Sequence, residues 1–236
     1  MNVIVALCQK EWRISMDTPQ GYVVSIAFLL ASGFFFGSNL FLNGQADMRH
    51  WFAVLPMLYI FFIPAMSMRL LADELHDGTF ELLATMPTRT LDIVLGKYFS
   101  LLGHITFLLA LTLMYPLTLS LLGNLDTGLI MASYLGAWLL AAAFAAICLY
   151  ASSLTSHAMI AYIVGLVLLL AVFLLSQVAP TLSPFIQDII SMLGPINHYH
   201  HLLRGVVSLD DVVLFVVVIV TFLALSWFDL ERRRWR

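Results

Sequence analysis

One group of residues has the types and spacing that suit metal binding, the segment "NHYHH" at 197–201. His198 and His201 are three residues apart, so on a helix they would share a face and could hold zinc or copper with a third ligand. Histidines in an exposed loop are also common as interfacial polar groups. We therefore assign no metal site from the sequence and keep three candidates, His198, His200 and His201.

The sequence motifs of several enzyme classes are absent. The only Gly-Lys pair, Gly96-Lys97, lacks the flanking glycines and the Ser or Thr of a phosphate-binding loop. The segment "ELHDG" lacks the second histidine of a zinc-protease helix, and there is no Gly-x-Ser-x-Gly elbow. An intramembrane enzyme would need a serine such as Ser38, Ser133 or Ser153 beside a histidine, and the sequence places none there. We predict no catalytic residue.

Charge is concentrated in the segment "MRLLADELHDGTFELLATMPTR", residues 68–89, although only 11% of the chain is charged. Gly78 should interrupt the helix that enters this segment. Thr79 could then cap a new short helix with Glu81 in its first turn, facing the positive end of the helix dipole. Its apolar face suits a groove on a soluble partner. The alternative is that it folds back onto the protein's own helices.

Composition indicates a membrane protein, because 61% of the 236 residues are hydrophobic and a soluble chain carries about 25% charged residues. Crossing a bilayer takes roughly 20 apolar residues. Six windows without Asp, Glu, Lys or Arg meet or approach this length: 22–42, 51–68, 98–122, 128–154, 158–178 and 212–228. Pro56, Pro64 and Pro116 should kink their helices. We expect one all-α membrane domain over 1–236, in which Cys8 and Cys148 are packing residues rather than a disulfide.

The spans indicate where energy must enter and how the chain is oriented. No span contains a charged residue, so energy for any transport should come from outside the membrane domain. His104, the one titratable group deep in a span, should be a hydrogen-bonded structural residue.

With the N-terminus inside, nine Lys and Arg lie on the inner side and two, Arg49 and Arg204, on the outer side. Both termini should therefore be cytoplasmic. The net charge of −3 gives no reason to expect a nucleic-acid partner.

Two further segments should form short helices. In 1–19, apolar residues recur every three or four positions and Pro19 ends the pattern, which predicts an amphipathic helix on the cytoplasmic membrane surface. A simple anchor is the alternative. The outer segment 179–211 should hold two short helices, one around 185–193 and one around 199–207, that partly re-enter the outer leaflet. Ordinary surface loops are the alternative there.

The stretches "KEWRISMDTPQGYVVSIAFLLASGFFF" and "MRLLADELHDGTFELLATMPTRTLDIVLGKY" resemble the permease subunits of ABC-2 type ATP-binding-cassette transporters. The nearest likeness is to the gliding-motility-type branch, which is similar also to the permease of nitrous-oxide reductase maturation. "HLLRGVVSLDDVVLF" continues the resemblance, which covers nearly the whole chain.

The resemblance implies an export-type permease in the bacterial inner membrane that binds no cofactor itself. ATP and Mg would be handled by two cytoplasmic ATPase copies. A second or related permease, lipid and an extracytoplasmic accessory protein are further partners that we expect. Segment 69–97 would carry the coupling helix, with Asp73, Glu74, Gly78, Thr79, Phe80, Glu81, Leu82 and Leu83 facing the ATPase. The elbow helix would contribute Lys10, Glu11, Trp12 and Arg13. The alternative function is an ATPase-driven scaffold or mechanical transmitter without cargo.

Overall fold

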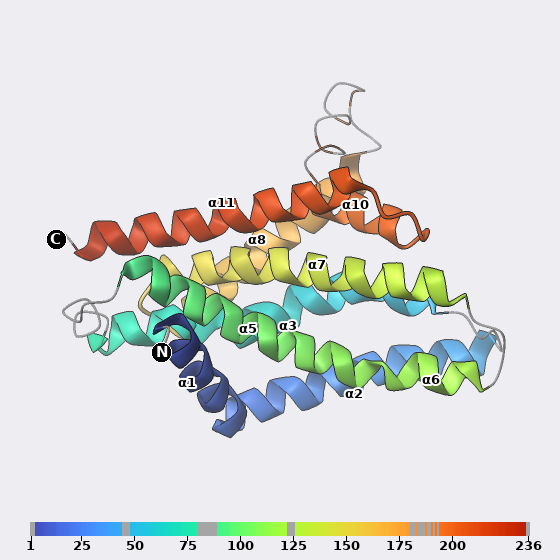
Figure 1. Ribbon diagram of the computed structural model, residues 1–236, viewed down its shortest axis with the longest axis horizontal. Helices are drawn as coiled ribbons and strands as arrows, with labels where there is room; N and C mark the ends of the chain where they lie inside the picture. Colours follow the sequence, from blue (N-terminus) through green and yellow to red (C-terminus); the bar gives the residue numbers. More distant parts are fainter. Residues whose placement is uncertain are drawn as a thin grey trace.

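In the computed structural model the protein is a bundle of helices (Figure 1). The structure describes residues 3–43, 48–79, 89–121, 126–179, 183, 187, 190, 192 and 194–234, and these contain no strand. The helices are α1 (Val3–Asp17), α2 (Pro19–Asn43), α3 (Arg49–His76), α5 (Thr90–Thr112), α6 (Met114–Ser120), α7 (Thr127–Ser153), α8 (Ala158–Val178), α10 (Pro195–Leu202) and α11 (Leu209–Arg234). The expected all-α fold is confirmed.

Six helical segments are long and apolar enough to cross a membrane, as predicted. They are α2, α3, α5 together with α6, α7, α8 and α11. α7 lies at the centre and is buried along most of its length, whereas only small parts of α2, α8 and α11 are buried. The core of α7 is a run of alanines, 141–143 and 145–146, and such small side chains let neighbouring helix backbones approach closely.

At two of the three prolines in the spans, a tyrosine hydroxyl donates the hydrogen bond that the proline cannot donate. A proline cannot donate to the carbonyl four residues earlier, so Pro56 frees the Phe52 carbonyl and Pro116 frees that of Thr112. The Tyr199 hydroxyl of α10 donates to the Phe52 oxygen at 2.7 Å. The Tyr134 hydroxyl of α7 donates to the Thr112 oxygen at 3.0 Å. The helix is broken near Pro116, between α5 and α6, but α3 continues through Pro56.

The first helix lies across the bundle instead of along it, and it packs on α5 (Figure 1). Two glycines of α5, seven residues apart, make room for it. A methyl group at Gly96 would lie 2.9 Å from Leu7 Cβ, and one at Gly103 would collide with the Trp12 ring. The predicted apolar face of this segment is therefore the face that meets α5.

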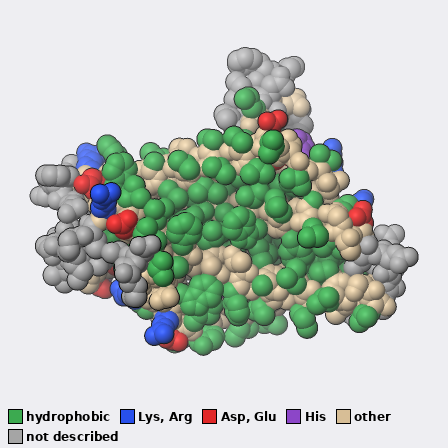
Figure 2. Space-filling model, in the orientation of Figure 1, with side chains coloured by type: hydrophobic (Ala, Val, Ile, Leu, Met, Phe, Trp, Pro, Cys, Tyr) green, Lys and Arg blue, Asp and Glu red, His purple; other side chains and the backbone are tan. Residues whose placement is uncertain are grey.

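Both chain ends lie toward the same end of the bundle, which we call the terminal end, together with the end of α3 and the start of α5 (Figure 1). The opposite end carries α10 and the start of α11. On the face shown in Figure 2, apolar side chains form a broad belt, and Lys, Arg, Asp and Glu gather toward the two ends. This distribution is the one that a bilayer-spanning bundle requires.

Candidate functional site

A buried lysine joins three helices at the terminal end. Lys97 Nζ, on α5, lies 2.7 Å from Glu74 Oε1 near the end of α3 and 3.3 Å from Glu11 Oε1 on α1. It also donates a hydrogen bond to the Leu70 carbonyl of α3. The Lys97 side chain is only 2% exposed, and those of Glu11 and Glu74 are 9% and 14% exposed.

The spanning helices extend beyond the charge-free windows of the sequence and include charged residues near their ends. The helix that holds Lys97 begins at Thr90, seven residues before the lysine, and buries it. Asp211 is likewise buried inside the last spanning helix. A search for charge-free windows places such residues outside the spans because it treats every charge as unpaired. In the folded chain a carboxylate or ammonium partner offsets much of the cost of burial.

The lysine cluster, which consists of Lys97, Glu11 and Glu74, has two carboxylates around one buried ammonium group. Glu11 and Glu74 share one buried cation, and Lys10 Nζ lies 3.9 Å from Glu11 in a far more exposed position. Glu74 Oε2 is buried and has no hydrogen-bond partner among the described residues. Glu74 therefore has one acceptor oxygen, Oε2, without a partner among these residues, although its other oxygen, Oε1, pairs with Lys97.

A cavity of about 450 Å³ lies beside the lysine cluster, between α1, α2 and α3. Charged groups of both signs line it: Lys10, Glu11, Arg69, Asp73, Glu74 and Lys97. Ala65, Met66 and Val24 contribute apolar wall. The cavity lies between α1 and the two helices α2 and α3.

His104 is a structural residue that holds α1 and α2 to α5. Its Nδ1 lies 2.7 Å from Ser15 Oγ and its Nε2 lies 2.8 Å from Ser25 Oγ. Because the Ser25 hydroxyl donates to the Gly21 carbonyl, Nε2 must be the protonated nitrogen, and Nδ1 accepts from Ser15. The expected hydrogen-bonded role of His104 is confirmed.

The residues predicted to face a partner fall into two groups. On α1, Lys10 and Arg13 are exposed, Trp12 packs on α5, and Glu11 is buried in the lysine cluster. Near the end of α3, Asp73 is partly exposed and pairs with Arg69 at 3.8 Å, but Glu74 points to Lys97. Gly78 has φ +68° and directly follows the end of α3. The Thr79 hydroxyl donates back to the Glu74 carbonyl at 3.4 Å. Phe80, Glu81, Leu82 and Leu83 lie outside the described residues.

Sequence reasoning missed Lys97 as a site residue, although one signal pointed to it. Glu11 follows Leu7 by four residues and Cys8 by three, which places an acidic group on the apolar face of the first helix. A carboxylate on a buried face needs a cation, and Lys97 is the buried cation that it meets.

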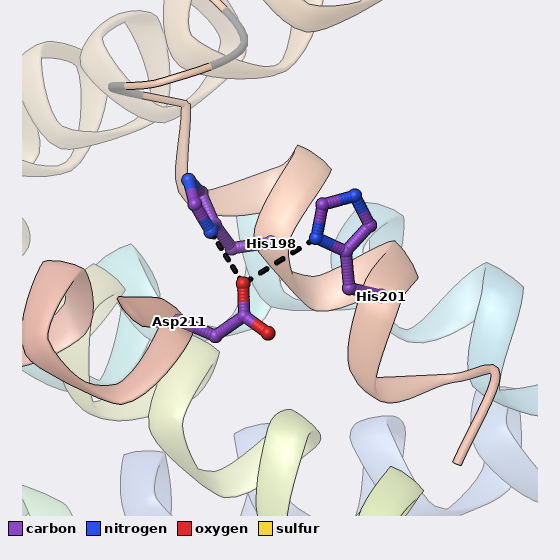
Figure 3. Close-up of side chains that lie close together, drawn as sticks. All are labelled: His198, His201 and Asp211. Carbon is purple, nitrogen blue, oxygen red and sulfur yellow. Dashed lines mark hydrogen bonds and ion pairs between the residues drawn. The ribbon is translucent and has the colours of Figure 1, made fainter. Parts of the chain in front are cut away.

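At the opposite end, the structure brings together two of the three candidate histidines. His198 and His201 lie on one face of α10, and Asp211 of α11 lies between them (Figure 3). His200 is not part of this group. Burial, with Arg204 and His201 nearby, lowers the pKa of His200. The helix predicted around 199–207 begins earlier, at Pro195, and ends at Leu202. Most of the other predicted outer helix lies outside the described residues.

Six apolar spans, charge gathered at both ends and a crossing amphipathic first helix define a multi-pass helical membrane protein. The family described as "ABC-2 family transporter protein" matches residues 5–235, and the chain belongs to this family. Its members are membrane subunits of ABC transporters and work with an ABC ATPase. The resemblance in the sequence is thus confirmed at the level of the family. No curated protein matches the chain.

Proposed function

We propose that this chain is the permease subunit of an exporter of the gliding-motility-type branch, in a bacterial inner membrane. Both termini face the cytoplasm, and two copies of a cytoplasmic ATPase bind below two permease chains. ATP and Mg are bound by the ATPase, so the permease itself carries no catalytic residue. The nine-to-two excess of Lys and Arg on the terminal side supports this orientation.

The observation that carries the proposal is the contact of Lys97 with α1 and α3. The resemblance assigns ATPase contact to the first helix and to the loop after α3, which are 60 residues or more apart in sequence. One buried ammonium group connects the first helix and the end of α3, from which that loop starts, to α5. A force applied to either segment would therefore reach a spanning helix through a close, buried contact instead of a flexible loop.

The coupling step follows from this contact. When the ATPases close on ATP, they displace the Asp73–Gly78 turn and α1 together. Gly78 has a left-handed backbone that few other residues adopt, which fixes the direction of the chain after α3. The neighbouring cavity leaves space for the displacement, and α3 and α5 tilt as rigid bodies. The apolar spans favour a lipid-like or large apolar cargo over a small ion.

The test is purification of the chain from native membranes with assay of vanadate-sensitive, Mg-dependent ATPase activity. Wild-type protein should carry this activity. Gly78→Pro should lose it, because proline cannot adopt φ +68°. Gly37→Ala is the matched control, because no atom in the described part of the chain lies within 4 Å of its new methyl group. Equal ATPase recovery with Gly78→Pro would overturn the assignment of the coupling turn. Wild-type protein without any ATPase would overturn the proposed complex.

Transport is tested separately from ATPase binding. Proteoliposomes that contain the intact complex should show ATP-dependent loss of a fluorescent lipid from the ATPase-exposed leaflet. ATP hydrolysis without lipid movement, across lipids of different headgroups, would contradict the lipid-like cargo and favour the scaffold function.

A further inference from the structure

The histidine pair at the opposite end faces a buried carboxylate. His198 Nδ1 lies 2.5 Å from Asp211 Oδ1, and His201 Nδ1 lies 3.4 Å from the same oxygen. One ligand atom from each residue lies within 4.8 Å of the others. The histidines come from one face of α10 and the aspartate from the first turn of α11, across a short connection (Figure 3). Two helices thus bring together three side chains that can each ligate a metal ion.

Asp211 is the least exposed carboxylate of the described residues. It is only 2% exposed, and its second oxygen, Oδ2, is buried without a hydrogen-bond partner among the described residues. An ionised carboxylate in such a place is costly unless cationic groups compensate it. The two histidines lie close enough to compensate this carboxylate, but they can do so only if a positive charge is present between their ring nitrogens and its oxygen.

The hydrogen bonds of His198 show where that charge must lie. Its Nε2 lies 3.2 Å from the Met192 carbonyl, which can only accept a hydrogen bond. A neutral imidazole has one N–H, so if Nε2 donates to Met192, Nδ1 is a bare lone pair. That lone pair faces the acceptor Asp211 Oδ1. Two acceptors in contact need either an additional proton or a metal ion between them.

We propose that His198, His201 and Asp211 form a binding site for a divalent transition-metal ion of the Zn²⁺ class. Imidazole nitrogen and carboxylate oxygen are common zinc ligands, and a histidine whose other nitrogen donates to a backbone carbonyl is the usual outer-shell arrangement. Ligand bonds of about 2.0–2.1 Å with tetrahedral angles require roughly 3.3 Å between ligand atoms. Binding of the ion would therefore lengthen the distance between His198 Nδ1 and Asp211 Oδ1 by less than about 1 Å.

Three protein ligands leave one coordination position open. The His201 side chain is 57% exposed, so this position lies at the surface of the protein. A metal held here would be accessible to water or to a ligand group from another molecule. The proposal rests on no residue of the lysine cluster, so its failure and the failure of the coupling mechanism are distinguishable.

The experiment uses full-length protein, purified in detergent with a tag that lacks histidine and stripped with a chelator. Zn²⁺ is titrated in competition with a chromogenic chelator at pH 7.5. Wild type should bind one tight equivalent. Since loss of an outer-shell partner alone costs about 10–100-fold, His198→Ala and Asp211→Asn should weaken binding by at least that factor. His200→Ala, on the same helix but outside the trio, should bind as wild type.

A second measurement separates loss of a ligand from misfolding. With Co²⁺ in place of Zn²⁺, wild type should show visible absorption of a tetrahedral site, and His198→Cys should add a thiolate-to-metal band in the near ultraviolet. The absence of a tight equivalent in wild type would overturn the proposal and leave a shared proton as the positive charge. Unchanged Zn²⁺ affinity in both His198→Ala and Asp211→Asn would overturn it equally.

Discussion

Replacing Lys97 with methionine is the sharpest test of the buried lysine cluster. Methionine has a similar length and no charge, so the change removes the ammonium while leaving most of the packing. Glu11 and Glu74 then remain as two buried carboxylates without the cation between them. Removing one partner of a buried ion pair costs about 3–5 kcal/mol. We expect a loss of that size in the free energy of unfolding, a large share of the 5–15 kcal/mol typical of a folded domain.

The assay is reversible unfolding in mixed micelles with increasing dodecyl sulfate, followed by tryptophan fluorescence. Lys10→Met is the matched control: Lys10 lies 3.9 Å from the same Glu11 carboxylate but is 55% exposed. An exposed pair contributes about 0–1 kcal/mol, so this variant should unfold almost as wild type does. The triple variant Lys97→Met, Glu11→Gln, Glu74→Gln should recover most of the loss, because a neutral replacement of a buried ion pair is often tolerated.

Two results would refute this reasoning. If Lys97→Met costs less than about 1 kcal/mol, the carboxylates are not held by the lysine. If the triple variant is as unstable as the single one, packing and not charge explains the loss. A triple variant that is stable but no longer supports ATPase-coupled activity would separate the structural role of the cluster from its coupling role.

The remaining predictions concern packing and the prolines. Gly103→Leu should collide with Trp12 and destabilise the α1–α5 contact by about 1–3 kcal/mol; the same unfolding assay should show Gly37→Ala unchanged, and a stable Gly103→Leu would contradict the packing. Tyr199→Phe should cost about 1–3 kcal/mol, because the Phe52 carbonyl that Pro56 frees is left without its donor. In the Pro56→Ala background the same change should cost much less, since the alanine N–H can donate to Phe52; equal costs in both backgrounds would contradict this explanation.

The six spans could be predicted from sequence because hydrocarbon burial is a local property of about 20 consecutive residues. The positions of the short helices depend on distant partners and could not. Nothing near Gly96 and Gly103 shows that Leu7 and Trp12 will occupy the space above them. Likewise, the donor that replaces the N–H lost at Pro56 is Tyr199, 143 residues later in the chain.

For the same reason, only some of the residues of the candidate sites could be predicted from the sequence. The histidine pair was visible from its spacing, but its carboxylate partner belongs to the next helix and meets the pair only after the chain turns back. Lys97 looked like a residue at the edge of a span because its two carboxylates come from segments far away in sequence. A charged residue in an apolar helix is therefore a site candidate when a residue of opposite charge, distant in sequence, lies on the apolar face of another helix. Glu11 is such a residue for Lys97.

One helix links the two ends of the molecule. α3 has 28 residues and is roughly 42 Å long at 1.5 Å per residue, and it contacts Lys97 through Glu74 at the terminal end. At the other end its Phe52 carbonyl binds Tyr199, the neighbour of His198. α3 continues as one helix through Pro56 and Pro64 and packs against the central α7, so a displacement of the whole helix moves both of its ends. A displacement of Glu74 would then change the support of α10, and by reciprocity a ligand that fixes α10 would resist that displacement.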